Sequence, residues 1–318
     1  MSEIRCCSDT KECRQVWERL IRPRCVFDSW DVRYCFHKHY QNPLNFLVAW
    51  RGPHPVGLLP LCWIDEYGYY GYFPGETWSG KTWLEQNRIP ADSARTRTEI
   101  LAYCADEIHL RYLTVESVKG VDGAVVDETG YLFYPEEYDF SMEEYWQAFS
   151  GKSRKRLGLE LSRWAEAGLE YRFGGLADVE WMFQTNLESF GERSYFHDQR
   201  FLQAFEDMIG LLDERGRLRI TSAIVRGRLA AVDVGAVDEG RYTVLAGGTD
   251  PEFTGIAKAI NLHHMEWACR CRLREVDFLC GDFGWKERFH LRPRPLYAWG
   301  NAGVCTAADQ RKAANVSA

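Results

Sequence analysis

Residues 218–248 read LRITSAIVRGRLAAVDVGAVDEGRYTVLAGG, and residues 249–270 continue as TDPEFTGIAKAINLHHMEWACR. Three runs rich in β-branched residues, at 218–225, 229–237 and 242–248, are joined by short turn-forming segments that contain glycine. This pattern predicts an antiparallel meander. A loop that opens a helix follows, and the run 275–280 predicts a further strand. The order of these elements indicates an α/β fold.

The rest of the chain predicts two domains. Strand-forming runs at 45–51, 56–64, 69–73, 112–116 and 131–134, with a helix over 94–110, indicate an N-terminal domain over residues 1–135. Ser141 has the capping-box spacing to Glu144, which starts a C-terminal domain over residues 136–304. Helices are expected in it at 179–190 and 199–214, with a last strand near 295–299. The small polar tail, residues 305–318, is expected to be flexible.

Composition narrows the classes of function. The 318 residues are 46% hydrophobic and carry a formal charge of −7, so a nucleic-acid partner would need a local basic patch. No run is long and apolar enough to span a membrane, and we expect a cytoplasmic protein. The 11 cysteines are scattered and lack zinc-site spacing, which predicts reduced thiols and no metal.

Four segments, in this order, carry a resemblance to a known family: SGKSRKRLGLELSRWAEAGLEY, FHDQRFLQAF, TDPEFTGIAKAINLHHMEWA and VDFLCGDFGWKERF. They resemble the CelD/BcsL-type proteins of the GNAT superfamily and the Fem-type aminoacyl-tRNA-dependent transferases, over roughly residues 141–289. The resemblance implies two GNAT-like halves, the first degenerate, with mixed, mostly antiparallel sheets flanked by helices. It also implies transfer of an acyl or aminoacyl group onto an amine, which forms an amide.

The resemblance places the donor's phosphates on backbone N–H groups where a loop opens a helix. The family's pattern there is Arg or Gln, two residues, Gly, one residue, then Gly or Ala. Gly255 and Ala257 fit this pattern, so Gly255, Ile256, Ala257 and Lys258 are the expected phosphate-binding residues. The basic or amide position is Glu252, whose carboxylate would repel a diphosphate. This departure argues against acyl-CoA as the donor.

The strand at 276–280 is followed by a loop with Asp282, Trp285 and Lys286, which we expect to be the catalytic residues. Lys286 aligns with a lysine that the Fem-type family associates with acyl transfer, where an ammonium can stabilise the developing oxyanion. The alternative for Lys286 is a solvated lysine paired with Glu287 or Asp282. Asp282 could orient the amine or stabilise a turn. Asp277 is expected to face solvent.

The segment after residue 150 is the strongest basic cluster, with Lys152, Arg154, Lys155, Arg156 and Arg163. The resemblance implies that Lys152, Arg154 and Arg156 contact phosphates, for which guanidinium groups are suited. The alternative is an ordinary charged helix face, partly neutralised by Glu160 and Glu166.

The sequence therefore predicts an amide-forming acyltransferase that moves an aminoacyl group from aminoacyl-tRNA onto the amine of a peptide or small molecule. The co-substrate is aminoacyl-tRNA or acyl-CoA, and no bound cofactor is expected. The alternatives are an acyl-CoA-dependent N-acetyltransferase and a non-catalytic binding protein of the same fold. The identity of the acceptor and the oligomeric state stay open.

Overall fold

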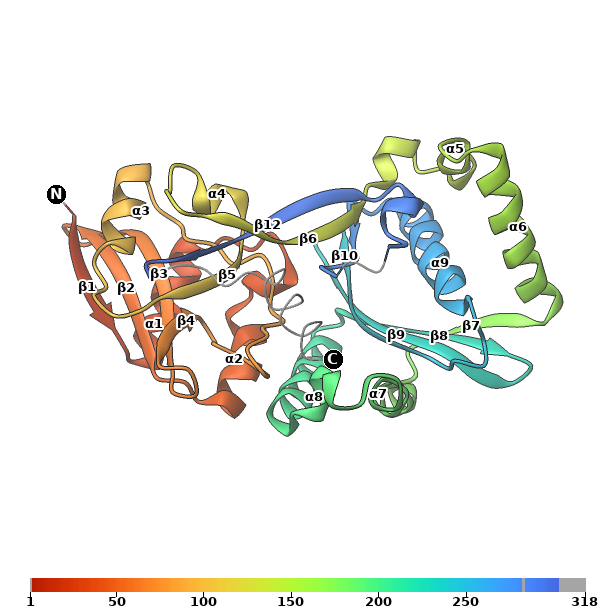
Figure 1. Ribbon diagram of the computed structural model, residues 1–318, viewed down its shortest axis with the longest axis horizontal. Coiled ribbons are helices and arrows are strands. Elements are labelled where there is room, and N and C mark those ends of the chain that lie inside the picture. The colour runs from red at the N-terminus through yellow and green to blue at the C-terminus, as the bar shows by residue number, and fades with distance from the viewer. Residues whose placement is uncertain (1, 282–283, 303–318) are drawn as a thin grey trace. The chain divides into compact units, whose positions relative to one another are not determined.

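The computed structural model of the protein (Figure 1) describes residues 2–281 and 284–302. Its strands make two mostly antiparallel sheets flanked by helices, which confirms the α/β prediction. The chain divides into two compact units. The first holds residues 2–129, 203–208 and 294–302, and the second holds residues 130–202, 209–281 and 284–293. The chain therefore passes between the units four times.

The first unit is built on an antiparallel four-stranded sheet in the order β1-β2-β3-β4. Strand β5 pairs antiparallel with β12, Arg292–Gly300, which comes from the C-terminal part of the chain. The other elements are β1 Glu3–Cys7, α1 Thr10–Leu20, α2 Trp30–Tyr40, β2 Leu44–Arg51, β3 His54–Ile64, β4 Tyr69–Tyr72, α3 Ala94–Leu101, β5 His109–Leu113 and α4 Val115–Val118.

The predicted helix over residues 94–110 is wrong in its second half. Ser93 caps α3, accepting a hydrogen bond from the Thr96 N–H, and the helix ends at Leu101. Residues 109–113 are strand because they pair with β12, almost two hundred residues further along the chain. The predicted strand at 112–116 stops at Leu113, and Val115–Val118 is helical. Long-range pairing outweighs local propensity at this point.

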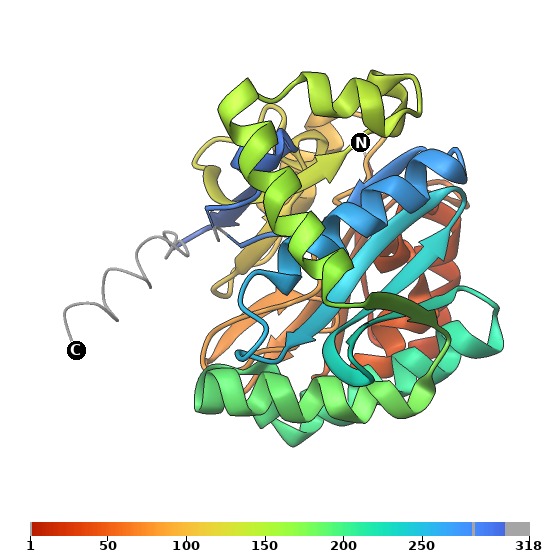
Figure 2. The same cartoon turned by 90° about the vertical axis from the view of Figure 1, so that its right-hand side faces the viewer.

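The second unit is built on strands in the order β6-β11-β10-β9-β8-β7. All neighbours are antiparallel except β10 and β11, which are parallel. Helices α9 and α7 cover opposite faces of the meander (Figure 2). Two of its elements, β6 and α8, also contribute residues to the first unit. The elements are β6 Val125–Phe133, α5 Met142–Gln147, α6 Gly151–Glu166, β7 Leu169–Phe173, α7 Leu176–Phe190, α8 Gln199–Glu214, β8 Leu218–Val225, β9 Arg228–Asp238, β10 Arg241–Thr249, α9 Ile256–Arg270 and β11 Glu275–Asp277.

Strand β11 is shorter than predicted. It pairs with β10 only over residues 275–277, and beyond this point β10 continues to Thr249 paired with β9. The end of β11 is set locally, because the Asp277 carboxylate accepts a hydrogen bond from the Leu279 N–H at 2.9 Å and Leu279 adopts a left-handed φ of 55°. Asp277 is only 2% exposed, so the expectation that it faces solvent is wrong.

A buried histidine–aspartate hydrogen bond holds α9 against the meander. The Nε2 of His264 lies 2.9 Å from Oδ2 of Asp233 on β9, and both side chains are at most 9% exposed. Two glycines make room for polar groups here, since a Cβ at Gly247 would collide with the Asp233 carboxylate and one at Gly235 with the Tyr242 ring. Because α9 carries the predicted phosphate loop at its first turn, this pair fixes the position of that loop.

The neighbouring His263 is packed between rings. It stacks on Tyr171 with 3.8 Å between ring centroids and lies 5.6 Å from Phe173. Burial lowers the pKa of His263 to about 3, and the adjacent His264 acts in the same direction. The neutral form of His263 is therefore the one that fits the folded protein.

This shift predicts a pH dependence of stability. His263 takes up a proton near pH 6.5 when unfolded but only near pH 3 when folded, so its contribution is complete above pH 6.5 and is lost as pH falls. Compared with His263→Phe, the wild-type free energy of unfolding should fall by up to about 1.4 kcal/mol more per pH unit below pH 6.5. Urea unfolding at pH 7 and pH 5 measures this. Parallel pH profiles for wild type and His263→Phe would contradict it, and the exposed His54→Gln is the control.

Candidate functional site

Lys286 is buried at the end of β11. Its side chain is 3% exposed, and its Nζ donates to the carbonyls of Phe278, Leu279 and Cys280 at 2.9, 2.8 and 2.9 Å. The alternative of a solvated loop lysine is therefore wrong. The ammonium has three donors, so it ties together three consecutive carbonyls where the backbone leaves the sheet. To stabilise an oxyanion, Nζ would have to release one of them.

The aromatic residue before this lysine is fixed by other rings. Trp285 meets Phe278 and Phe289 edge to face, with centroids 5.6 and 5.4 Å apart. Asp282, the third expected catalytic residue, lies outside the described residues. The described part of the loop is thus a rigid frame around Lys286.

The first turn of α9 offers two backbone donors. Gly255 is its N-cap with a left-handed φ of 93°, and no side chain caps the helix. The N–H groups of Ile256 and Lys258 close turns onto the carbonyls of Phe253 and Gly255. Those of Gly255 and Ala257 make no hydrogen bond within the described chain. These two donors, at the positive end of the helix dipole, suit an anion.

Glu252, the residue that departs from the family pattern, is paired. Its carboxylate lies 2.9 Å from Nη2 of Arg228 on β9, which also reaches Asp250 at 3.3 Å and lies over the Phe253 ring. The pair is exposed, so it offsets part of the repulsion expected for a diphosphate. Because Arg228 is 24 residues away in the sequence, the loop pattern alone could not reveal it.

Lys258 points toward α6. Its Nζ lies 2.6 Å from Oε2 of Glu160, and this ion pair joins α9 to α6. The side chains of Lys258 and Glu160 are 41% and 30% exposed. A phosphate bound by Lys258 would therefore compete with Glu160 for the ammonium.

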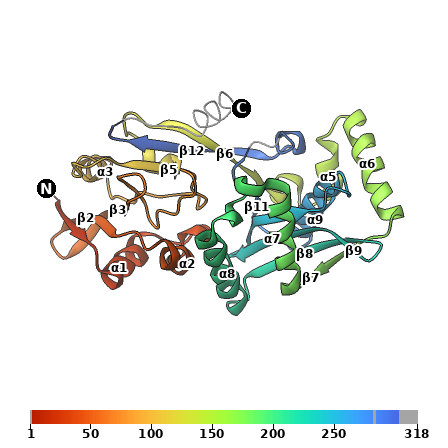
Figure 3. The ribbon, with the colours of Figure 1, turned by 60° about the horizontal axis from the view of Figure 1, so that its bottom comes forward.

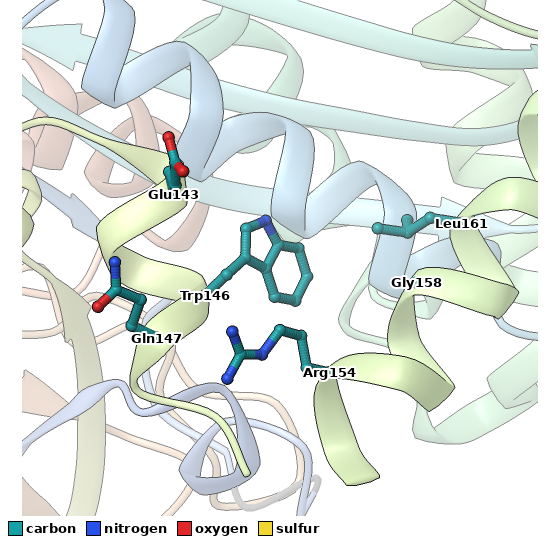
Figure 4. Close-up of a pocket in the computed structure, with 6 residues that line it drawn as sticks. All are labelled: Glu143, Trp146, Gln147, Arg154, Gly158 and Leu161. Atoms are coloured by element: carbon teal, nitrogen blue, oxygen red, sulfur yellow. The ribbon is translucent and has the colours of Figure 1, made fainter. Parts of the chain in front are cut away.

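Helices α5 and α6 lie next to each other at one end of the second unit (Figure 3) and enclose a hollow of about 880 Å³. Figure 4 shows that the Trp146 ring from α5 and the Arg154 guanidinium from α6 face this hollow together. Glu143, Gln147, Gly158 and Leu161 complete its described lining. A flat ring beside a guanidinium suits a ligand with both an aromatic ring and a phosphate.

The predicted basic cluster lies along α6. Leu157 is the only buried residue of this helix, and the residues on its other sides are largely exposed. Lys152, Arg156 and Arg163 share one face by helical spacing, and Arg154 points into the hollow. Within residues 2–281 and 284–302, none of these four cations or Lys155 forms an ion pair. The helix therefore presents uncompensated positive charge.

Two contributors to this site were not predicted. Trp146 belongs to the helix after Ser141. The run MEEYWQAF does not reveal that Trp146 lines the hollow while its neighbour Tyr145 is fully buried. Arg228 lies in a strand whose turn was recognised, but its ion pair with Glu252 depends on the fold. The spacing of residues within one segment therefore cannot predict the place of Trp146 in the hollow or the pairing of Arg228.

Other kinds of site are not found in the part of the chain that the structure describes. No group of three or more His, Cys, Asp or Glu side chains there could hold a metal ion. No described helix is both long and apolar enough to cross a bilayer. The ten cysteines of the described residues form no disulfide there.

Comparison with known proteins identifies the domain that carries these groups. Residues 151–287 match the model of a family described as an acetyltransferase (GNAT) domain. The match includes α6, the first turn of α9 and the lysine loop. A search of the curated proteins finds no significant match.

Several solved structures share the fold over nearly the whole chain. FemX matches with a TM-score of 0.56 at 10% identity, covering 99% of this chain and 100% of that one. L-PGS from Bacillus licheniformis matches at 0.56 and 11% identity, covering 92% and 91%. A tandem GNAT protein from the clavulanic acid biosynthesis pathway matches at 0.51 and 14% identity, covering 94% and 98%. These likenesses confirm the predicted tandem fold, and at such identities they concern the fold alone.

Proposed function

We propose, from the match of residues 151–287 to the acetyltransferase (GNAT) domain, that the chain moves an aminoacyl group from aminoacyl-tRNA onto an amine. The product is an amide, and the acceptor is a peptide or a small molecule. Acyl transfer is the chemistry of the superfamily, and the donor and the acceptor are what we propose for this chain.

The uncompensated positive charge of α6 is the observation that favours aminoacyl-tRNA as the donor. Five cations lie within residues 152–163 of a protein whose net charge is −7, and they form no ion pair in the described chain. Lys152 and Arg163 are eleven residues apart, which is about 16 Å along a helix. A row of this length can contact several phosphates of a nucleic acid at once, while a single CoA diphosphate needs less.

The hollow between α5 and α6 supports the same donor. Arg154 lies at the start of the charged helix, and Trp146 offers a ring on which a terminal base can stack. The volume of about 880 Å³ is sufficient for a nucleotide. The 3′-terminal nucleotide of a tRNA would then lie beside the phosphate contacts of α6.

Acyl-CoA is the second candidate donor, and one observation favours it. The N–H groups of Gly255 and Ala257 are unoccupied in the described chain, and the Glu252 carboxylate is engaged by Arg228. A diphosphate could therefore bind at the start of α9 with less repulsion than the sequence suggests.

For the transfer step we propose that Lys286 and Trp285 hold the end of β11 in the geometry that places the acyl carbonyl. The amine attacks this carbonyl, and a donor near the developing oxyanion lowers the barrier. Collapse of the tetrahedral intermediate breaks the ester bond and releases the terminal ribose of the tRNA, whose oxygen takes up a proton to become a hydroxyl. Lys286 could supply that donor by releasing one of its three backbone carbonyls. We propose that Asp282 accepts a proton from the ammonium group of the acceptor, which leaves the neutral amine that attacks.

The donor is tested by titrating the protein with acetyl-CoA and with a charged tRNA pool at two salt concentrations. We expect salt-sensitive tRNA binding. The triple variant Lys152→Ala/Arg156→Ala/Arg163→Ala should weaken it and reduce the slope of log K against log salt by about 2–3, because each phosphate contact contributes about 0.7–0.9. The matched control, Lys11→Ala/Arg22→Ala/Lys119→Ala, removes the same charge from exposed sites of the first unit and should bind like wild type.

Three outcomes would overturn the proposal. Stoichiometric acetyl-CoA binding without tRNA binding would make the protein an acyl-CoA enzyme. An equal effect of the α6 variant and the control would show that net charge, and not α6, attracts tRNA. Binding of neither donor would favour a non-catalytic protein.

A further inference from the structure

The first unit contains a further cavity, lined by residues from the segments 24–28, 86–88, 114–116 and 294–296. It has a volume of about 280 Å³. The charged and polar residues of its wall that matter here are Arg24, Asp28, Arg88, Thr114, Glu116 and Arg294. Val115 and Leu296 add apolar surface. The cavity is thus small and carries several charges of both signs.

Most of these charges are already matched within the protein. Asp28 is 4% exposed and accepts hydrogen bonds from the Arg88 Nε at 2.9 Å and from the backbone N–H groups of Arg24 and Cys25 at 2.7 and 3.2 Å. Arg88 also pairs with the second oxygen of Asp28 at 2.8 Å. Nη2 of Arg294 lies 3.6 Å from Glu85. These two arginine–carboxylate pairs form the rigid part of the wall.

Arg24 and Glu116 differ from the other charges. Both side chains are on exposed residues that line the cavity, and neither forms a hydrogen bond or an ion pair through its charged group within the described chain. They also do not pair with each other, although they share one small cavity. An unmatched guanidinium and an unmatched carboxylate therefore face a common space, with the apolar Val115 and Leu296 beside them.

We propose that this cavity binds a small zwitterion that carries a carboxylate, an ammonium group and a short apolar part, which is the chemistry of an apolar amino acid. Arg24 binds the carboxylate, for which guanidinium geometry is suited, and Glu116 binds the ammonium. Arg88, which also lines the cavity and is held in place by Asp28, adds a second guanidinium group to the wall. A volume of about 280 Å³ admits a single amino acid and excludes a nucleotide or a long peptide.

The experiment uses the full chain and L-leucine as the probe, followed by thermal shift and by calorimetry. We expect saturable leucine binding by the wild type. Arg24→Ala and Glu116→Gln should each weaken it at least tenfold, while acetate or ethylammonium alone should bind far more weakly than leucine. The controls are Arg22→Ala and Asp65→Asn, which remove the same charges from exposed positions outside the cavity. Both controls should bind leucine like wild type.

Several results would overturn this site. Absence of leucine binding at millimolar concentration, equal binding by wild type and Arg24→Ala, or equal loss in the control variants would each do so. If acetate binds as tightly as leucine and Glu116→Gln has no effect, the site takes simple carboxylates and the zwitterion assignment is wrong. The outcome is independent of the transfer reaction, because the variants leave α6, α9 and the lysine loop unchanged.

Discussion

The variant His264→Leu is expected to lose about 3–5 kcal/mol of unfolding free energy, because it leaves the Asp233 carboxylate buried without its partner. His264 is fully buried, and its Nε2 is 2.9 Å from the carboxylate. The transition in urea, followed by circular dichroism, measures the loss. Because α9 is attached to the meander through this pair, the first turn of α9 should also lose protection against hydrogen exchange.

A double variant separates the buried charge from simple loss of packing. In Asp233→Val/His264→Leu neither charge remains, so the protein should be more stable than His264→Leu alone, even though two residues are changed. The control is His109→Leu, which removes a partly exposed histidine paired with Glu107 at 2.7 Å and should cost at most about 1 kcal/mol. If the double variant is less stable than His264→Leu, the ion pair stabilises the fold in its own right and the argument from an unpartnered charge fails.

The second large effect is expected for Lys286→Met, which keeps the length of the side chain and removes its three donors. The carbonyls of Phe278, Leu279 and Cys280 would lose a charged partner, and the unfolding free energy should fall by about 3 kcal/mol. Acyl transfer should fall at least about a hundredfold if Lys286 supplies the oxyanion donor, since one such donor is worth about 3 kcal/mol.

The two roles of Lys286 are measured separately. Unfolding in denaturant measures the structural role. The amount of labelled aminoacyl group transferred per mole of folded protein measures the catalytic role. Lys258→Met, which removes an ion pair whose lysine side chain is 41% exposed, should cost less than about 1 kcal/mol. A stable but inactive Lys286→Met would show a purely catalytic lysine, and a destabilised variant with full transfer would show a purely structural one.

Local pattern predicted the strands well where hydrophobic runs are bounded by turns. The strands at 218–225, 229–237 and 242–248 and those near 45–51, 56–64 and 69–73 are all present. The local sequence pattern did not predict β1, α1 or α2. The residues 109–113 were assigned to a helix because their partner strand, β12, lies far along the chain. Propensity describes a segment alone, whereas an edge pairing depends on which segment arrives beside it.

The candidate site shows the same limit. The loop that opens α9 could be located from the sequence because Gly255 and Ala257 are close together. The environment of Lys286 could not, because its partners are backbone carbonyls, which every residue type possesses. The pairs Glu252–Arg228 and Asp233–His264 join residues 24 and 31 positions apart, so no short motif contains both members.

The four passages of the chain between the two units have a consequence for synthesis on the ribosome. Leu113 of β5 pairs with Tyr297 of β12, and 184 residues separate them. At roughly 5–20 residues per second, the nascent chain holds β5 for about 10–40 seconds before its partner strand emerges. Throughout that interval one edge of β5 lacks the partner it has in the finished protein. Vectorial folding therefore cannot complete the N-terminal part first, and premature termination anywhere before residue 297 would release a chain with an open strand edge, a target for aggregation or for chaperones.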